Sequence, residues 1–136
     1  MKILVVDAQG GGLGRALIEK LRAANLPVEI FGVGTNSMAT ASLRKAGADA
    51  CATGENAVIY NAKHADIIMG GMGILSANAM MGEISPAMAA AISESDAVKL
   101  LIPLNRCNIV VCGVQDIPLP AKIDLAVDEI RARLEA

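Results

Sequence analysis

The chain has 136 residues, of which 54% are hydrophobic and 19% are charged, and its formal net charge is −2. This length supports one domain and is too short for a dehydrogenase with a separate substrate domain. The slight acidity and the low aromatic content (1%) argue against DNA or RNA as a partner. Three cysteines without CxxC spacing and a single histidine give no metal pattern, so we expect no metal site and reduced thiols in a cytoplasmic protein.

The first element is the apolar run over residues 3–6, which predicts a strand that ends at Asp7, directly before a glycine-rich turn. Glycines let the backbone approach a phosphate, and the amino end of the following helix favours negative charge. We therefore expect this turn to hold a small phosphorylated ligand, and its candidate binding residues are Gln9, Gly10, Gly11, Gly12, Leu13, Gly14 and Arg15.

The spacing of this turn departs from GxGxxG, because Arg15 stands at the third glycine position. As GxxxGxA, the residues Gly10, Gly14 and Ala16 match, and this spacing resembles the cofactor loop of short-chain dehydrogenases. Arg15 either adds positive charge to the site or is a solvated side chain of the first helical turn.

The elements that follow alternate between helix and strand. The pattern predicts helices over 13–24, 37–46, 55–63, 74–81, 86–93 and 123–134, and strands over 28–33, 48–52, 67–69, 99–104 and 109–114. Only residues 105–108 join the last two strands, which is too short for a parallel crossover, so we expect an antiparallel hairpin. We thus predict a single Rossmann-like three-layer α/β domain over residues 1–136, with a mostly parallel six-stranded sheet in the order 3-2-1-4-5-6 and an antiparallel last strand.

A second glycine turn, with Gly70, Gly71 and Gly73, follows the fourth predicted strand. In the predicted order, strands one and four are neighbours at the switch point of the sheet. Both glycine turns are therefore expected to face one crevice, where a ligand would bind.

The end of the second predicted strand lacks the acidic residue that binds the ribose in an NAD site. Thr35, Asn36 and Ser37 stand there instead. These side chains, together with Arg44, suit a 2′-phosphate or a smaller phosphorylated ligand, and NADP is preferred to NAD. Ser37 as a helix N-cap explains part of the same pattern without a ligand.

Catalytic residues are not identified by the sequence. Tyr60 and Lys63 are three residues apart and precede strand four, unlike the Tyr-xxx-Lys pair of short-chain dehydrogenases. Candidate acids and nucleophiles are Glu55, Glu83 and Cys107, which follows Arg106. Each also has a structural explanation. Thr53 and Ser85, near the two glutamates, fit helix caps, and residues 105–108 fit a turn. His64 fits a surface position at a helix end.

Methionines gather around the second glycine turn, at Met69, Met72, Met80, Met81 and Met88. Core filling explains them, and so does an adaptable interface, so we expect a homo-oligomer. The uncharged stretch over 67–82 is shorter than the ~20 residues of a membrane span, so no membrane partner is expected.

Several linked segments, over residues 7–14, 34–37, 52–56, 61–63 and 102–108, resemble an uncharacterised family of small bacterial proteins, a domain of unknown function. The resemblance covers nearly the whole chain and implies a cytoplasmic Rossmann-like protein. It implies no reaction and no catalytic residue.

Three hypotheses follow. The first is a protein that binds a nucleotide or dinucleotide, with NADP leading. The second is S-adenosylmethionine binding, because Asp7 followed by glycines resembles a methyltransferase loop, although the missing acid after strand two counts against it. The third is a non-enzymatic oligomeric sensor or scaffold subunit, which the lack of catalytic machinery favours.

Overall fold

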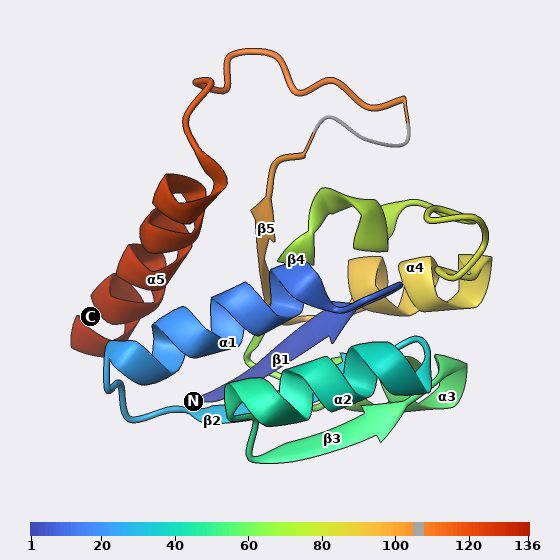
Figure 1. Ribbon diagram of the computed structural model, residues 1–136, viewed down its shortest axis with the longest axis horizontal. Helices are drawn as coiled ribbons and strands as arrows, with labels where there is room; N and C mark the ends of the chain where they lie inside the picture. The colour runs from blue at the N-terminus through green and yellow to red at the C-terminus, as the bar shows by residue number, and fades with distance from the viewer. Residues whose placement is uncertain (105–107) are drawn as a thin grey trace.

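The computed structural model describes residues 1–104 and 108–136, in which strands and helices alternate along the chain (Figure 1). In order, the elements are β1 (Lys2–Asp7), α1 (Gly12–Ala23), β2 (Glu29–Gly34), α2 (Ser37–Ala46), β3 (Ala50–Thr53), α3 (Glu55–Ala62), β4 (Ile67–Gly71), the short 3₁₀ helix η1 (Met72–Leu75), α4 (Pro86–Glu94), β5 (Val98–Ile102) and α5 (Leu119–Glu135). The sequence pattern therefore predicted most elements to within a few residues.

The strands form one parallel sheet in the order β3-β2-β1-β4-β5. Val5 of β1 pairs with Gly32 of β2 on one side and with Met69 of β4 on the other. The chain is thus a single α/β domain, and the expected neighbouring positions of strands one and four are confirmed. The prediction of a sixth, antiparallel strand is wrong for the described residues.

The core lies on both faces of the sheet because side chains alternate along each strand. Ile3 and Val5 pack with residues of α1, α2 and α5, whereas Leu4 and Val6 pack with residues of α3 and α4. Figure 1 shows α1 and α2 in front of the sheet and α3 behind it. Covering by helices on both faces explains why the strands are almost continuously apolar.

The sixth predicted strand is the apolar run over 109–114. In the structure, residues 108–118 contain no strand and project away from the sheet (Figure 1). The strand preference of β-branched residues depends on packing against cross-strand and same-face neighbours. No partner strand lies beside this run within the described part of the chain, so the sequence pattern alone gave the wrong result.

The helix predicted over 74–81 is also wrong. Only the short η1 forms, and turns follow it. Asn78, Met80, Met81 and Gly82 have positive φ angles of 63°, 56°, 57° and 88°, which interrupt a right-handed helix. The segment over 76–84 is therefore a folded loop between η1 and α4.

The methionines around the second glycine turn divide between core and surface. Met69 and Met88 are buried, whereas Met81 is 97% exposed. Core filling thus accounts for Met69 and Met88 and in part for Met80, which packs against the core, whereas Met81 is the one large apolar side chain of this loop that is open to solvent. In residues 1–104 and 108–136 no helix combines the length and apolar character needed to cross a bilayer.

Candidate functional site

The glycine turn after β1 closes tightly onto α2. Gly11 has φ of 74°, and a Cβ atom at this position would lie 2.9 Å from the carbonyl oxygen of Ala39. Gly11 is therefore fixed both by its left-handed backbone and by close packing. A Cβ on Gly10 or Gly12 would meet no atom within 4 Å, so these two glycines face open space.

Asp7 holds this turn against the first turn of α1. One carboxylate oxygen accepts a hydrogen bond of 2.8 Å from the amide of Ala8, and the other accepts one of 2.6 Å from the amide of Gly14. The side chain is buried, so both hydrogen bonds form away from bulk water. The amides of Gly12 and Leu13 precede Gly14 in the helix and have no intrahelical acceptor.

Gly14 and Gly70 have packing roles. A Cβ on Gly14 would lie 2.5 Å from Cδ2 of Leu43, and one on Gly70 would lie 2.8 Å from the carbonyl oxygen of Val6. Gly14 thus allows α1 to pack closely, as the GxxxGxA spacing suggested. Neither glycine lines the cavity described next.

A cavity of about 270 Å³ lies between the two glycine turns. It is lined by Asp7, Ala8, Gln9, Gly10, Gly11, Gly12, Leu13, Gly71, Gly73, Ile74, Met80, Leu104 and Leu119. One wall presents the backbone of the first turn, and the other is largely apolar. The two turns share this cavity because β1 and β4 are adjacent strands.

Thr35, Asn36 and Ser37 do not line this cavity, and Thr35 and Asn36 contact Glu83 instead. The Oε1 atom of Glu83 accepts hydrogen bonds from the Thr35 hydroxyl (2.7 Å), from Nδ2 of Asn36 (2.8 Å) and from the backbone amide of Gln9 (2.9 Å). The hydrogen bond from Thr35, and next the one from Gln9, lower the pKa of the Glu83 carboxyl below its ordinary value of 4.5. Sequence reasoning named Glu83 only as a candidate acid, and the 74 positions that separate it from Gln9 gave no signal of this contact.

The N-cap of α2 is Asn36 and not Ser37. Its Oδ1 accepts a 2.9 Å hydrogen bond from the amide of Ala39, while its Nδ2 donates to the carbonyl of Gln9 at 3.0 Å. An asparagine amide offers both an acceptor and donors, so Asn36 caps the helix and joins the glycine turn at once. Ser37 is the first residue of the helix.

Neither of the two arginines considered for the site lines the cavity. Arg15 pairs with Glu19 at 2.8 Å on the exposed face of α1. Arg44 lies in the last turn of α2, and α2 runs back from the carboxyl edge of the parallel sheet. Arg44 is exposed, and it lies two residues after Ser42, whose hydroxyl donates to the carbonyl of Gly10 at 2.9 Å. A role of Arg44 beside Thr35 stays a prediction.

The other catalytic candidates do not meet in the cavity. Glu55 is exposed at the start of α3, where Gly54 and not Thr53 is the N-cap. Tyr60 is 59% exposed and its ring lies 4.7 Å from that of His64, which is also exposed, as expected. Ser85 does cap α4, as predicted. Arg106 and Cys107 lie outside the described residues.

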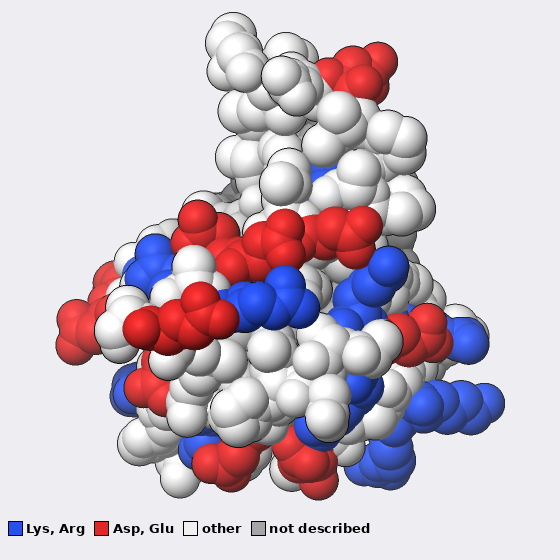
Figure 2. All heavy atoms as spheres, turned by 90° about the vertical axis from the view of Figure 1, so that its left-hand side faces the viewer, with Lys and Arg blue, Asp and Glu red and all other residues white. Residues whose placement is uncertain are grey.

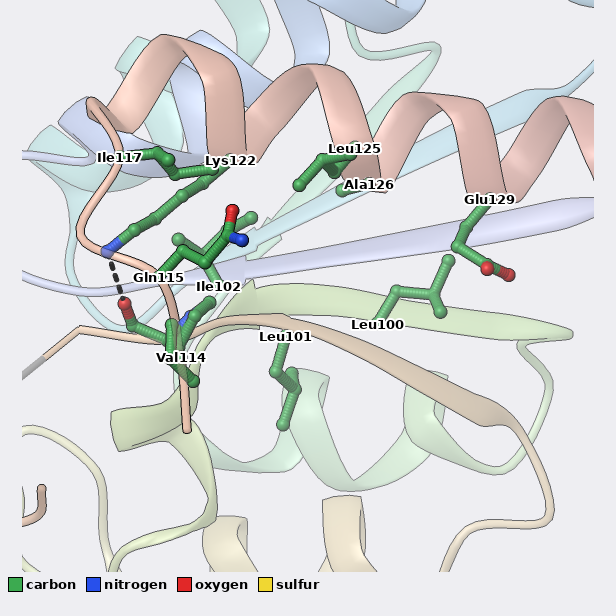
Figure 3. A pocket seen from close by; sticks show the side chains of 11 residues that line it. Leu100, Leu101, Ile102, Val114, Gln115, Ile117, Lys122, Leu125, Ala126 and Glu129 are labelled. Carbon is green, nitrogen blue, oxygen red and sulfur yellow. Dashed lines mark hydrogen bonds between the residues drawn. The ribbon is translucent and has the colours of Figure 1, made fainter. Parts of the chain in front are cut away.

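A second hollow, of about 330 Å³, lies between β5 and α5 (Figure 3). Leu100 and Ile102 of β5 face Leu125 and Ala126 of α5 across it, and Lys122 closes one end by donating to the carbonyl of Pro103 at 3.0 Å. It is larger than the glycine cavity, but it lacks a set of backbone amides at a helix start. A ligand site needs a few convergent polar groups, so the glycine cavity is the better candidate.

Residues 1–104 and 108–136 contain no group of three or more His, Cys, Asp or Glu side chains that could hold a metal ion. The polar character of the site therefore comes from the glycine-turn amides, Asp7 and the neighbouring Glu83.

Comparisons with known proteins found a family and a similar crystal structure. A crystal structure described as a dodecameric FMN-dependent Ubix-like decarboxylase from Escherichia coli O157:H7 is similar to the chain, with a TM-score of 0.47 and 18% identity over 96% of this chain and 76% of that one. No curated protein matches the chain. A family described as "Domain of unknown function (DUF3842)" matches residues 2–135, and the chain therefore belongs to this family.

Proposed function

We propose that the chain binds a small nucleotide, with one phosphate held by the glycine turn after β1. The observation that carries this proposal is the cavity shared by the turns after β1 and β4. In parallel α/β sheets, ligands bind outside the carboxyl ends of the strands where the strand order reverses. β1 and β4 flank that point here.

The geometry of the turn supports a phosphate. Gly10 and Gly12 present no side chain toward the open space beside them. The amides of Gly12 and Leu13 stand at the positive end of α1, where an anion is stabilised. Asp7 already engages the amide of Gly14, so the phosphate would bind ahead of that residue.

The size of the cavity favours a mononucleotide portion. Its volume of about 270 Å³ lies just below the usual range for drug-sized ligands, about 300–1,000 Å³. The apolar wall formed by Ile74, Met80 and Leu104 suits a sugar or a base edge. We therefore place a phosphate and its sugar inside, with any remaining part of the ligand outside.

NADP is the ligand that this geometry supports least among those expected from the sequence. The sequence predicts its 2′-phosphate at Thr35, Asn36 and Ser37, and the first two of these donate to the carboxylate of Glu83. A phosphate beside this carboxylate would be repelled. A ligand with a free ribose avoids that repulsion.

The test is the thermal stability of the purified chain with AMP, ATP, GTP, FMN, NAD(H), NADP(H) and S-adenosylmethionine. A ligand at 100 times its Kd stabilises the native state by about 2.7 kcal/mol. We expect stabilisation by at least one nucleotide that lacks a 2′-phosphate. If none of these compounds raises Tm, the proposal is refuted.

A second candidate function, an oligomeric sensor or scaffold, is supported by the projecting segment over residues 108–118. Its apolar side chains are open to solvent, with Val110 74% and Val114 43% exposed. Figure 2 shows that few charged side chains lie on the projection at the top, whereas both signs of charge cover the body. β5 is an edge strand of the sheet, so a second copy of this chain offers both an edge and a strand-forming segment. Light scattering that finds only monomer at micromolar concentration would refute this candidate.

A further inference from the structure

Three donors converge on a single oxygen atom beside the proposed site. Oε1 of Glu83 accepts from the Gln9 amide, the Thr35 hydroxyl and Nδ2 of Asn36, all within 2.7–2.9 Å. The donors come from the turn after β1 and from the junction of β2 and α2. Several donors directed at one point are the arrangement that proteins use for an anion.

This group of donors adjoins the glycine cavity. Gln9 lines the cavity and also donates its amide to Glu83. In dinucleotide-binding folds, the position after the second strand receives the ribose hydroxyl or the 2′-phosphate. In this chain the carboxylate at that position comes from the loop before α4 and not from the end of β2.

The loop that carries Glu83 is held in place by its own backbone. The amide of Gly82 donates to the carbonyl of Asn78 at 3.0 Å, and the amide of Ile84 donates to the carbonyl of Ala79 at 3.2 Å. Ile84 is fully buried, which anchors the residue next to Glu83 in the core. The same loop places Met80 in the wall of the cavity. Glu83 is therefore presented to the donors by a folded segment.

We propose that Glu83 is a specificity-determining residue that fills the anion position after β2 and so excludes ligands with a phosphate on the ribose 2′-oxygen. This inference rests on the proposed nucleotide site. Its physical basis is competition and repulsion: a 2′-phosphate would need the three donors that the carboxylate holds, and it would approach a like charge. The pKa of Glu83 lies below its ordinary value of 4.5, so the carboxylate is ionised at neutral pH.

The test compares 5′-AMP with 2′,5′-ADP, which differ only in the 2′-phosphate, by calorimetry on the wild type and on Glu83→Ala. The wild type is expected to prefer 5′-AMP. Glu83→Ala is expected to gain about tenfold or more in affinity for 2′,5′-ADP, because the freed donors form charge-assisted hydrogen bonds. Glu29→Ala is the control, because it removes the same charge from an exposed position at the far end of β2. It is expected to gain no affinity for 2′,5′-ADP.

Inorganic phosphate gives a readout that does not depend on the nucleotide. In ¹H–¹⁵N spectra of Glu83→Ala, phosphate should shift the amides of Thr35 and Asn36, and adding Thr35→Val should abolish this response. If Glu83→Ala does not fold, Glu83→Gln serves in its place, because the amide oxygen still accepts the three hydrogen bonds while the charge is gone. With Glu83→Gln, the preference for 5′-AMP over 2′,5′-ADP should weaken.

The outcomes separate the two proposals. The role of Glu83 alone is overturned by three results together. The wild type binds 5′-AMP, the Glu83 variant gains no affinity for 2′,5′-ADP, and phosphate does not shift the Thr35 amide of that variant. A wild type whose glycine-turn amides respond to no nucleotide or phosphate overturns the proposed function. A phosphate response at Thr35 in Glu83→Ala would still support the anion position in that case.

Discussion

The carboxylate of Asp7 accepts a 2.6 Å hydrogen bond from the backbone amide of Gly14, which ties the last residue of β1 to the first turn of α1. Asp7 also accepts from the amide of Ala8, so it shapes the turn from both ends. Because the side chain is buried, these hydrogen bonds replace water as partners of the two amides. The glycine turn is thus formed before any ligand binds.

Asp7→Ala is expected to destabilise the fold by about 2–4 kcal/mol, because it leaves two amides without this acceptor. Asp66→Ala is the matched control, since Asp66 also accepts from a backbone amide, that of Lys2, at 2.7 Å, but is exposed. That change is expected to cost no more than about 1 kcal/mol. Urea denaturation measures both, and equal losses would contradict the structural role of Asp7.

Gly14→Ala is expected to lower the free energy of unfolding by about 1–3 kcal/mol, because the added methyl group meets Leu43 and Asp7. Gly12→Ala, two positions earlier in the same helix, meets no atom within 4 Å and lacks a positive φ. It should be neutral or slightly stabilising. Thermal unfolding of the two variants checks this prediction. If Gly14→Ala is as stable as the wild type, α1 does not pack as closely as described.

Gly12→Val should abolish stabilisation by whichever nucleotide raises the Tm of the wild type. The side chain would extend into the open space beside Gly12, where the phosphate is placed. Ala23→Val, at the other end of α1, introduces the same β-branched residue on an exposed position and should keep the full response. A Gly12→Val variant that folds and still responds would locate the ligand elsewhere.

Glu83→Gln should reduce stability at neutral pH and lose this deficit in acid. The folded-state pKa of Glu83 lies below its ordinary value of 4.5, so its contribution is complete above that value and disappears as pH falls through the folded-state pKa. We expect a deficit of about 1 kcal/mol at pH 7 that shrinks below pH 4.5. The pKa of Asp49 is also lowered, first by the hydrogen bond from the Ile30 amide and then by Arg22. Asp49 is present in both the wild type and Glu83→Gln, so both proteins still lose some stability in acid. A deficit that grows in acid would contradict the hydrogen bonds to an ionised Glu83.

Val110→Lys tests the projecting segment as a contact between copies of this chain. Light scattering of the wild type is expected to give a molar mass above that of the monomer. Val110→Lys should lower this mass toward that of the monomer, because a charge would be buried at the contact. Met81→Lys places the same charge on a still more exposed apolar residue (97% against 74% for Val110) of a different surface, the loop before α4, and should have no effect. If Met81→Lys lowers the molar mass and Val110→Lys does not, the interface lies instead at the loop over residues 76–84.

Local patterns determined most of the elements. Alternating apolar runs and helical periodicity over β1, α1, β2 and α2 predicted strands and helices near their observed bounds, since these segments each bury a face defined by their own spacing. The same reasoning brought the two glycine turns together, because it depended only on the order of parallel strands. It was wrong for residues 109–114 and 74–81, where pairing partners and left-handed backbone decide the outcome.

The α/β class, the glycine turn after Asp7 and the absence of an acid at the end of β2 all follow from local sequence patterns. The position of Glu83 follows from the packing of the whole fold, since its hydrogen bonds to Gln9, Thr35 and Asn36 join segments that are far apart along the chain. Spacing rules describe neighbours within one helix, strand or turn, and contacts between distant loops depend on how all the layers pack. The acid that the second strand lacks is therefore supplied by a loop that no local pattern connects to it.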